Sequence, residues 1–522
     1  MATLIAEIAP FANEPILTFR DEESKRAMRE ALANARRAPG AVYDLIIGGK
    51  RVKSPKQFES RNPAKPSEVV GTVQSATVEQ AREAVAAAEK AFATWSRVPA
   101  SQRADLLFKA AAEVRRRRYE FDALLVLEVG KSWGEADGDT AEGIDFLEYY
   151  AREMLRYDGV HPVTPIKGEK NGMRYIPLGV GVVVPPWNFA FAILVGMTAA
   201  AIVTGNTVVL KPSSDSPVIA AKFVELLENV GMPPGVVNLV TGSGGAIGDE
   251  LVKHPRVRFI AFTGSKEIGL RVNQLAAEPR PGQIWIKRVV AEMGGKDSIV
   301  VAADADLDAA VEGVAQAAYG YQGQKCSACS RAIVEAPVYD EFLRKLEERV
   351  KTITVGDPAE PENYMGPVVN ERSLQKIMSY VEQGKKEGRL VSGGQRAPGD
   401  GWFAQPTVFA DIPPDGKLAQ EEIFGPVLAV IKAKDYDQAI EIANNTEFGL
   451  TGAVYSRDPA KLDRAREEFH VGNLYLNRKC TGAMVGAHPF GGFNMSGTDS
   501  KAGGPDYLLL FMQAKSVSEK VG

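Results

Sequence analysis

Cysteine is scarce in this chain: the 522 residues include only three, at positions 326, 329 and 480. So few cysteines argue against a disulfide framework and favour a reducing compartment, so we expect a cytoplasmic protein. Cys326 and Cys329 form a C-x-x-C pair, for which a redox dithiol or half of a zinc site is one interpretation. Because a second C-x-x-C or Cys/His pair is missing, we expect no metal site.

A strong excess of charge of either sign is also missing. The net charge is −4, from 62 basic and 66 acidic residues, so no global field attracts nucleic acid. The one basic run, Arg115 to Arg118, continues an amphipathic helical pattern and indicates a solvated helix face. We therefore expect no nucleic-acid partner.

The chain lacks an uninterrupted apolar run that spans a bilayer. Residues 175–210 carry no charged side chain, but Pro185 and Pro186 interrupt them and Gly205 ends them with a turn. This pattern predicts a strand, a turn, a buried helix, a turn and a strand, so no membrane association is expected. The first 15 residues also lack a basic segment followed by an apolar core, and no signal peptide is expected.

Apolar strands alternate with helices in two blocks after residue 165. The composition, with 45% hydrophobic and 25% charged residues, is that of a globular protein of about three lobes. Alternation of this kind predicts an α/β fold with two doubly wound parallel sheets, which bind ligands at the carboxyl ends of their strands. Earlier helices are predicted over residues 77–95, with a capping box at Thr77, over 100–119 and over 140–157.

The two ends of the chain have simpler patterns. Residues 1–40 are predicted to be polar and helical, with no assigned function. Residues 507–512 are apolar and are predicted to form a late strand, whose edge invites a partner subunit.

Cys326 is the first candidate for chemistry, because its neighbours are polar. A buried structural cysteine normally has apolar neighbours, whereas the ammonium group of Lys325 favours a thiolate. The thiolate is the nucleophilic form, so Cys326 is a candidate nucleophile. Two ordinary core cysteines at 326 and 329 are the alternative.

Two glycine-rich turns follow predicted strands. Residues 242–248 have the spacing G-x-G-x-x-x-G, which by itself is weak evidence for a dinucleotide. Gly264 and Ser265 end a strand and open a helix, whose free N–H groups could face a phosphate. A structural turn is the alternative for each motif. Lys211, at the end of another strand, could donate to ribose hydroxyls or be merely solvated.

Seven short strings occur in the order seen in aldehyde dehydrogenases, and the chain resembles that family from about residue 40 to its C-terminus. The strings are PWNF at 186–189, LKPS at 210–213, FTGS at 262–265, EMGGK at 292–296, GQKC at 323–326, EIFGP at 422–426 and PFGG at 489–492. The resemblance implies oxidation of an aldehyde to a carboxylate by NAD or NADP. It also implies a cofactor-binding domain at 41–157 and 176–288, a catalytic domain at 289–490, and bridging, oligomerisation segments at 158–175 and 500–522. These domains follow the N-terminal helical segment predicted over 1–40.

The resemblance assigns three catalytic roles. Cys326 would attack the carbonyl carbon, Asn188 would donate to the oxyanion, and Glu292 would activate the water that hydrolyses the thioester. The setting of Glu292 beside apolar residues and two glycines is expected to raise its pKa and let it move.

Cofactor contacts follow from the same resemblance. The implied residues are Pro186, Trp187, Lys211, Ser213, Ser214, Gly264, Ser265, Glu422 and Phe424. Many NAD-selective members carry glutamate where this chain has Ser214, and a missing carboxylate removes repulsion against a 2′-phosphate. We expect NAD, with NADP as a possible second cofactor.

The loop at residues 477–486 resembles a subgroup of the family that oxidises L-glutamate γ-semialdehyde, the 1-pyrroline-5-carboxylate dehydrogenases. The resemblance implies that Gly482, Ala483 and Ser327 bind the substrate carboxylate, that Phe189 and Phe490 pack its aliphatic chain, and that Glu142 meets its amino end. Backbone donors suit a carboxylate, because an uncharged aldehyde would leave them unpaired. Ordinary turn structure is the alternative for Ser327 and Gly482.

The expected function is therefore the second step of proline degradation, in which L-glutamate γ-semialdehyde is oxidised to L-glutamate through a thiohemiacetal and a thioester. Another short aldehyde, such as succinate semialdehyde, is the runner-up substrate. A coenzyme A-acylating enzyme or a non-catalytic structural protein would not need Cys326, Glu292 and Asn188 together. The length leaves no room for a fused proline dehydrogenase barrel of about 250 residues. We expect a homo-oligomer built from dimers, with proline dehydrogenase as a candidate partner.

Overall fold

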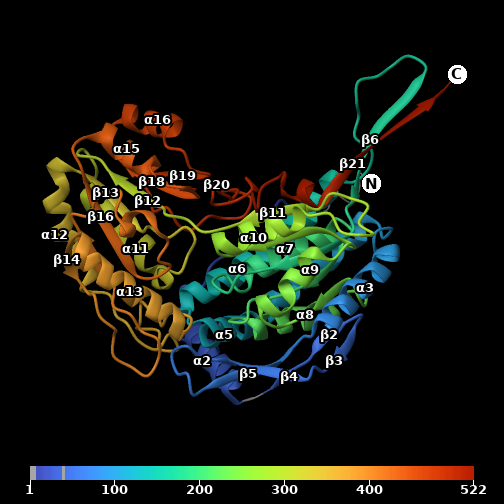
Figure 1. Ribbon diagram of the computed structural model, residues 1–522, viewed down its shortest axis with the longest axis horizontal. Coiled ribbons are helices and arrows are strands. Elements are labelled where there is room, and N and C mark those ends of the chain that lie inside the picture. Colours follow the sequence, from blue (N-terminus) through green and yellow to red (C-terminus); the bar gives the residue numbers. More distant parts are fainter. Residues whose placement is uncertain (1–7, 38–40, 522) are drawn as a thin grey trace.

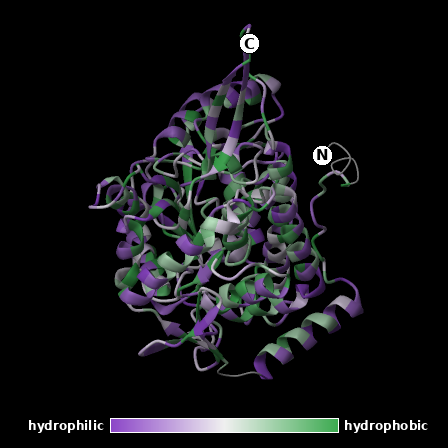
Figure 2. Ribbon diagram, turned by 90° about the vertical axis from the view of Figure 1, so that its right-hand side faces the viewer, coloured by the Kyte–Doolittle hydropathy of each residue, from purple (hydrophilic) through white to green (hydrophobic). Residues whose placement is uncertain are grey.

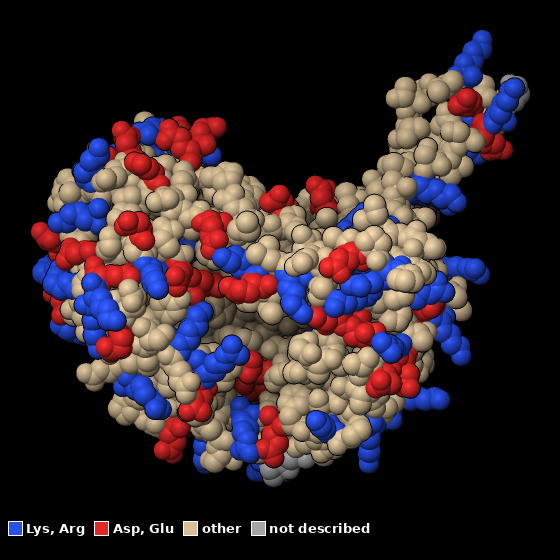
Figure 3. All heavy atoms as spheres, in the orientation of Figure 1, with Lys and Arg blue, Asp and Glu red and all other residues tan. Residues whose placement is uncertain are grey.

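The computed structural model describes residues 8–37 and 41–521. Two lobes lie side by side, and a two-stranded ribbon projects away from them (Figure 1). Positive and negative side chains are interspersed over the face in Figure 3, which also shows a hollow between the lobes. Within the described residues, no helix is both long enough and apolar enough to cross a membrane.

The first lobe is built on a seven-stranded sheet in the order β11-β10-β7-β8-β9-β2-β3. Its strands are β2 (Leu45–Ile47), β3 (Lys50–Val52), β7 (Val180–Val184), β8 (Thr207–Leu210), β9 (Val237–Leu239), β10 (Val257–Thr263) and β11 (Arg288–Glu292). Strands β7 to β11 run parallel, whereas β2 and β3 form an antiparallel hairpin at the edge. The predicted domain boundary at residue 288 falls at the start of β11, and the domain division itself stays a prediction.

Helices cover both faces of this sheet. Val182 of β7 packs in the same cluster as the alanines of α3 (Val78–Trp95), whereas Val183 packs with α7 (Ala192–Val203). Successive side chains of a strand point to opposite faces, so a short, wholly apolar strand serves two cores. The capping box at Thr77 is confirmed, because its hydroxyl accepts from the Gln80 N–H at 3.2 Å. Helices α8 (Pro217–Asn229), α9 (Asp249–Lys253) and α10 (Lys266–Ala277) complete the layers.

A layer of helices packs beyond α7. It contains α2 (Glu22–Arg37), α4 (Ala100–Arg116), α5 (Arg118–Val129) and α6 (Trp133–Tyr157). The helical prediction is wrong for residues 8–20, which form no helix, while residues 1–7 and 38–40 lie outside the described part. The solvated basic face is also only partly right, because Arg118 is 9% exposed and pairs with Asp137 at 2.5 Å.

The second lobe repeats the layered arrangement with the strand order β14-β15-β16-β13-β12-β18-β19. Its strands are β12 (Ser298–Val301), β13 (Arg331–Glu335), β14 (Arg389–Ser392), β15 (Thr407–Ala410), β16 (Val427–Ala433), β18 (Thr451–Tyr455) and β19 (Asn473–Leu476), all parallel to their neighbours except β14. Helices α11 (Leu307–Tyr319) and α12 (Tyr339–Val350) cover one face, and α13 (Glu371–Glu387), α15 (Tyr436–Asn444) and α16 (Pro459–Glu468) the other. The prediction of an α/β fold with two doubly wound sheets is confirmed.

The ribbon consists of β6 (Glu169–Pro177) paired antiparallel with β21 (Met512–Lys520). The strand predicted over residues 507–512 is wrong, because Tyr507–Phe511 forms a 3₁₀ turn. Tyr507 stacks on Tyr150 of α6 with ring centroids 5.5 Å apart, and Phe511 is fully buried. These apolar side chains therefore belong to the core rather than to an open edge.

Candidate active site

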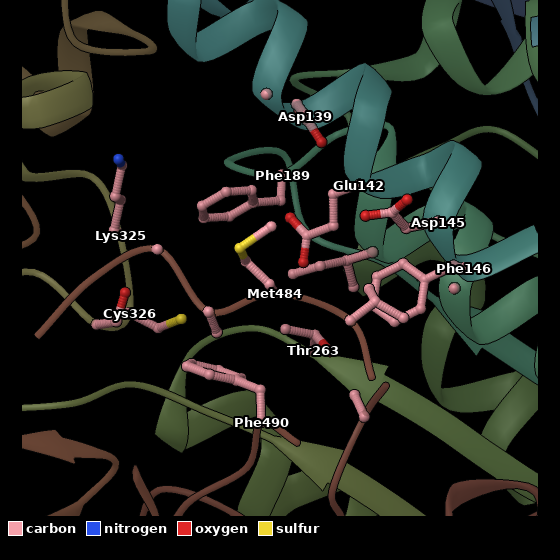
Figure 4. A pocket seen from close by; sticks show the side chains of 18 of the residues that line it. Asp139, Glu142, Asp145, Phe146, Phe189, Thr263, Lys325, Cys326, Met484 and Phe490 are labelled. Atoms are coloured by element: carbon pink, nitrogen blue, oxygen red, sulfur yellow. The ribbon is translucent and has the colours of Figure 1, made fainter. Parts of the chain in front are cut away.

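A cavity of about 460 Å³ opens between the lobes. Its walls come from α6, the turn before α7, the end of β11, the segment at 325–327 and the loop at 479–485. Figure 4 shows Phe189, Glu142, Met484 and Phe490 around it, with the Cys326 side chain directed inward. Eight predicted site residues line this one cavity: Cys326, Glu292, Ser327, Gly482, Ala483, Phe189, Phe490 and Glu142.

A tight turn after α11 presents Cys326. Tyr321 and Gln322 have positive φ angles of 49° and 56°, followed by Gly323 at 67°. A Cβ atom on Gly323 would lie 2.5 Å from the Gly425 carbonyl oxygen, so only glycine fits. Buried hydrogen bonds hold the turn, including one of 2.8 Å from the Tyr321 hydroxyl to the Val129 carbonyl.

Burial raises the pKa of the Cys326 thiol well above its usual value, and the nearby carboxyl groups of Asp297 and Glu292 raise it further. The prediction that the ammonium group of Lys325 favours the Cys326 thiolate is wrong. Its ammonium group lies 2.7 Å from Glu135 Oε1, and Figure 4 shows the side chain directed away from the Cys326 sulfur. The thiol is therefore protonated before it meets a substrate, and its attack on a carbonyl carbon requires a proton acceptor.

Glu292 ends β11 with its carboxyl group at the cavity. Oε1 accepts from the Gly492 N–H at 2.9 Å, and Oε2 accepts from the Ser500 hydroxyl at 3.2 Å. Burial raises the pKa of Glu292 well above its usual value, which confirms that part of the prediction. A carboxyl group with a raised pKa is a better base once it is ionised.

Asn188 lies next to the segment that carries Cys326. It is 4% exposed, and its Nδ2 donates to the Gln324 carbonyl at 3.1 Å. The bond ties the turn before α7 to the Cys326 segment. Its role as an oxyanion donor stays a prediction.

The Gly482 loop is shaped by Arg478, which the sequence reading missed. Arg478 Nη2 donates to the carbonyls of Thr481 and Gly482, each at 3.0 Å. In a trans peptide the C=O and the following N–H point in opposite directions, so the N–H groups of Gly482 and Ala483 face away from Arg478. Two adjacent backbone donors on one side of a loop suit a carboxylate.

One face of α6 forms much of the cavity. Glu135, Asp139, Glu142 and Phe146 recur at helical spacing, and all four line it. The predicted helix began at residue 140, so it included Glu142 and Phe146 but missed Glu135 and Asp139, although the spacing was visible. Gly134 and Gly138 weakened the helical pattern before residue 140, because glycine is a poor helix former. Burial and the neighbouring Asp139 raise the pKa of Glu142 to about 8.

The ring of Phe189 packs against the buried ammonium group of Lys131, which no sequence motif indicated. Lys131 Nζ lies 4.3 Å from the centre of the Phe189 ring and 4.4 Å from that of Tyr321. The same nitrogen is 3.3 Å from Asp139 Oδ2, and both side chains are fully buried. Cation–π contacts of this kind fix the orientation of the ring that faces the cavity.

Several predicted cofactor residues meet on the other side of Cys326. The rings of Trp187 and Phe424 pack edge to face with centroids 5.5 Å apart, and Pro186 precedes Trp187. Glu422 Oε1 accepts from the Gly295 N–H at 3.1 Å, and burial raises the Glu422 pKa. An aromatic wall next to a fixed carboxylate suits a ribose and a flat ring.

Lys211 directly follows β8 and is a buried ammonium group. Burial lowers its pKa to about 8, and its Nζ donates to the Pro212 carbonyl at 3.2 Å. Ser213 Oγ accepts from the Asp215 N–H, and Ser214 Oγ donates to the Gly242 carbonyl, both at 3.3 Å. Their contacts with a cofactor stay predictions.

The turn at Gly264 and Ser265 opens α10. The Gly264 N–H donates to the Glu292 carbonyl at 3.1 Å and so is not available to a phosphate, whereas the expectation that the free N–H groups at the start of α10 face a phosphate stays a prediction. Ser265 caps the helix, since its hydroxyl accepts from the Ile268 N–H at 3.5 Å. The role of both residues in cofactor binding stays a prediction.

The remaining cysteines have ordinary surroundings. Cys329 is 2% exposed and its thiol donates to the Arg331 carbonyl, while the Cys480 thiol donates to the Ser327 carbonyl. Neither is paired in a disulfide. In the described part of the chain, no group of three or more His, Cys, Asp or Glu residues is placed to hold a metal ion.

Comparison with known proteins places this geometry in a family. A 1-pyrroline-5-carboxylate dehydrogenase from Geobacillus sp. (strain WCH70) is 58% identical over 98% of this chain and 99% of its own length. A crystal structure of 1-pyrroline-5-carboxylate dehydrogenase from Thermus with bound NAD has a TM-score of 0.97 at 52% identity, covering 98% of this chain and all of that one. Proline utilization A from Bdellovibrio bacteriovorus has a TM-score of 0.97 at 47% identity, covering 98% of this chain and 53% of that one. Residues 51–517 match the aldehyde dehydrogenase family, and the chain belongs to that family.

Proposed function

We propose that this protein catalyses the NAD-dependent oxidation of L-glutamate γ-semialdehyde, formed from 1-pyrroline-5-carboxylate, to L-glutamate in proline degradation. The observation that carries the proposal is that Cys326, Glu292 and the Gly482–Ala483 loop line one cavity. The names and high identities of the relatives support the same substrate.

The first step is attack of the Cys326 sulfur on the aldehyde carbon, which gives a thiohemiacetal. Burial keeps the thiol protonated in the resting enzyme, so its proton passes to the carbonyl oxygen as the C–S bond forms, and it leaves that oxygen when the hydride departs and the thioester carbonyl forms. Asn188, tied to the Cys326 segment, is the side-chain donor that we assign to the developing oxyanion.

The residues beside Cys326 fit a dinucleotide. Trp187 and Phe424 offer an aromatic wall, Glu422 an oriented carboxylate and Lys211 a buried ammonium group for ribose hydroxyls. When bound, NAD accepts the hydride that leaves the substrate carbon. Absence of a carboxylate at Ser214 leaves NADP as an alternative cofactor.

Glu292 is the base that we assign to the second half-reaction. It takes a proton from water, and the water oxygen attacks the thioester on Cys326 to release the carboxylic acid. Its raised pKa suits this role, and the Gly492 and Ser500 donors orient its two oxygens.

Substrate selection would come from the groups that surround the α-carbon and the methylene chain of the substrate. The amides of Gly482 and Ala483, with Ser327, would bind the α-carboxylate, and Phe189 and Phe490 would flank the methylene groups. Glu142 lies on α6, where it would meet the amino group. An aldehyde without these substituents leaves the polar groups unpaired.

Steady-state NADH formation from L-glutamate γ-semialdehyde, succinate semialdehyde and pentanal tests the proposal. The highest kcat/KM is expected for L-glutamate γ-semialdehyde, and a higher value for succinate semialdehyde would refute it. Cys326→Ala should abolish oxidation and spare NAD binding, with Cys329→Ala as the matched control. Substantial turnover by Cys326→Ala would refute the nucleophile assignment.

We also propose a cytoplasmic homo-oligomer, with proline dehydrogenase as a partner that supplies 1-pyrroline-5-carboxylate. The unpaired cysteines suit a reducing compartment. Ile284 and Ile286 are 80% and 88% exposed, and burial against a second subunit would remove these apolar side chains from water. Light scattering after size-exclusion chromatography checks the oligomer, since a monomer at micromolar concentration would contradict it.

A further inference from the structure

The stretch Phe11–Leu17 precedes the part of the chain that matches the aldehyde dehydrogenase family, which begins at residue 51. It forms no helix or strand and leads into α2. Figure 2 shows the chain rising from α2 along the side of the molecule towards the N-terminus. Two of its residues, Glu14 and Ile16, line the same cavity as Cys326.

Asn13 joins two walls of that cavity. Its Nδ2 donates to Asp145 Oδ2 on α6 at 2.8 Å and to the Val485 carbonyl at 3.0 Å. Val485 follows Ala483 by two residues, so Asn13 connects the loop at 477–486, here called the substrate loop, to α6. The Glu14 N–H donates to the other oxygen of Asp145 at 2.7 Å, so both carboxylate oxygens hold this stretch.

Further contacts fix the path of the stretch on either side of Asn13. The Leu17 N–H donates to Asp137 Oδ2 at 2.6 Å, and Arg118 Nη2 donates to the Pro15 carbonyl at 2.7 Å. Phe11 packs edge to face on Tyr149 with ring centroids 5.1 Å apart. A substitution of Asn13 therefore leaves the stretch anchored at both ends.

Phe11 also contacts the substrate loop. A Cβ atom on Gly486 would lie 3.1 Å from a Phe11 ring carbon, so the Phe11 ring leaves little space for a side chain at this position of the loop. The loop is thus held by Arg478 before Gly482 and by Asn13 and Phe11 after Ala483.

We propose that Phe11–Ile16 is a wall of the aldehyde cavity, and that Asn13 is a positioning residue that sets selectivity for aldehydes carrying an α-carboxylate. Asn13 acts through the Gly482–Ala483 amides and has no contact with the reacting carbon. The inference rests on the proposed function, because it assigns those amides to the substrate carboxylate. The segment lies before residues 51–517, the part of the chain that matches the aldehyde dehydrogenase family.

The test compares Asn13→Ala and Asn13→Asp with the unsubstituted protein, using L-glutamate γ-semialdehyde and pentanal as substrates. Pentanal has the same number of carbon atoms but no carboxylate. Loss of the Asn13 hydrogen bonds to Asp145 and Val485 should raise KM for L-glutamate γ-semialdehyde by about five- to tenfold, while kcat changes less than about twofold. Asn13→Asp should raise that KM further, because it places a second carboxylate beside Asp145. KM for pentanal should stay unchanged.

Asn34→Ala is the matched control, since Asn34 lies exposed on α2 away from the cavity. Equal losses with both aldehydes, whether in KM, kcat or folded yield, would overturn the positioning role, as would an unchanged KM in both variants. If the unsubstituted protein oxidises pentanal but not L-glutamate γ-semialdehyde, the proposed function fails and the inference falls with it. If it oxidises L-glutamate γ-semialdehyde and Asn13→Ala has no effect, only the inference fails.

Discussion

Replacement of Arg478 by methionine should selectively weaken binding of a substrate that carries a carboxylate. The guanidinium donates to the carbonyls of Thr481 and Gly482 at 3.0 Å each and lies 4.4 Å from the centre of the Tyr475 ring. Methionine keeps an unbranched apolar stem, although it is shorter than arginine, and loses every donor. The two peptide units are then free to rotate, and the amides of Gly482 and Ala483 lose their shared direction.

The magnitude follows from the lost contacts. The two hydrogen bonds that the partly buried guanidinium donates contribute about 1 kcal/mol each, the value for an ordinary hydrogen bond, because water competes for the guanidinium. The cation–π contact adds about 0.5 kcal/mol, much of which Met–aromatic packing replaces. A net loss of about 2 kcal/mol in carboxylate binding corresponds to a rise in KM of about 30-fold.

Steady-state kinetics with L-glutamate γ-semialdehyde and pentanal is the assay, accompanied by thermal unfolding. The rise in KM is expected for L-glutamate γ-semialdehyde alone, with kcat changed by much less. Arg457→Met is the matched control, because Arg457 pairs with Asp306 on the surface, where both side chains are more than half exposed. An unchanged KM, or the same change with pentanal, would refute the assignment of the loop amides to the carboxylate.

Three further perturbations test other parts of the site. Glu292→Gln should slow hydrolysis of the thioester by about 10²–10⁴-fold while the first hydride transfer persists, so rapid mixing should show a burst of NADH before a slow steady state; a lost burst would place Glu292 in the first half-reaction. Burial raises the pKa of Glu142 from an ordinary value of 4.5 to about 8, so ionisation of the buried carboxyl group costs stability progressively as pH rises between those values. Glu142→Gln should therefore raise the melting temperature more at pH 8.5 than at pH 5, and an equal effect at both would contradict the raised pKa. Gly323→Ala should destabilise the fold by about 2 kcal/mol or more in denaturant unfolding, because its φ is 67° and its Cβ would meet the Gly425 carbonyl; Gly244→Ala, where a Cβ meets nothing within 4 Å, is the control.

Local patterns in the sequence predicted most of the sheets and helices. Strands such as Val180–Val184 are short apolar runs between turn residues, and their conformation depends on neighbours in the chain. The cap at Thr77 is equally local, since its hydroxyl meets the Gln80 N–H within one turn. Motif strings identified Cys326 and Glu292 because the chemistry demands those residue types.

Long-range contacts decided what the patterns left open. An apolar run such as Tyr507–Phe511 is compatible with a strand or a buried turn, and stacking on Tyr150 selects the turn. Sequence adjacency suggested that Lys325 activates Cys326, whereas Glu135, 190 positions away, holds its ammonium group.

The sequence by itself determined the fold class and the residues that we assign as reacting groups. Tertiary structure alone decided the pKa direction of Cys326, the shape of the Gly482 loop and the place of Asn13 beside it. The physical reason is that secondary structure and chemical type depend on residues near in the chain. Burial, charge and loop position depend on residues brought together from hundreds of positions apart.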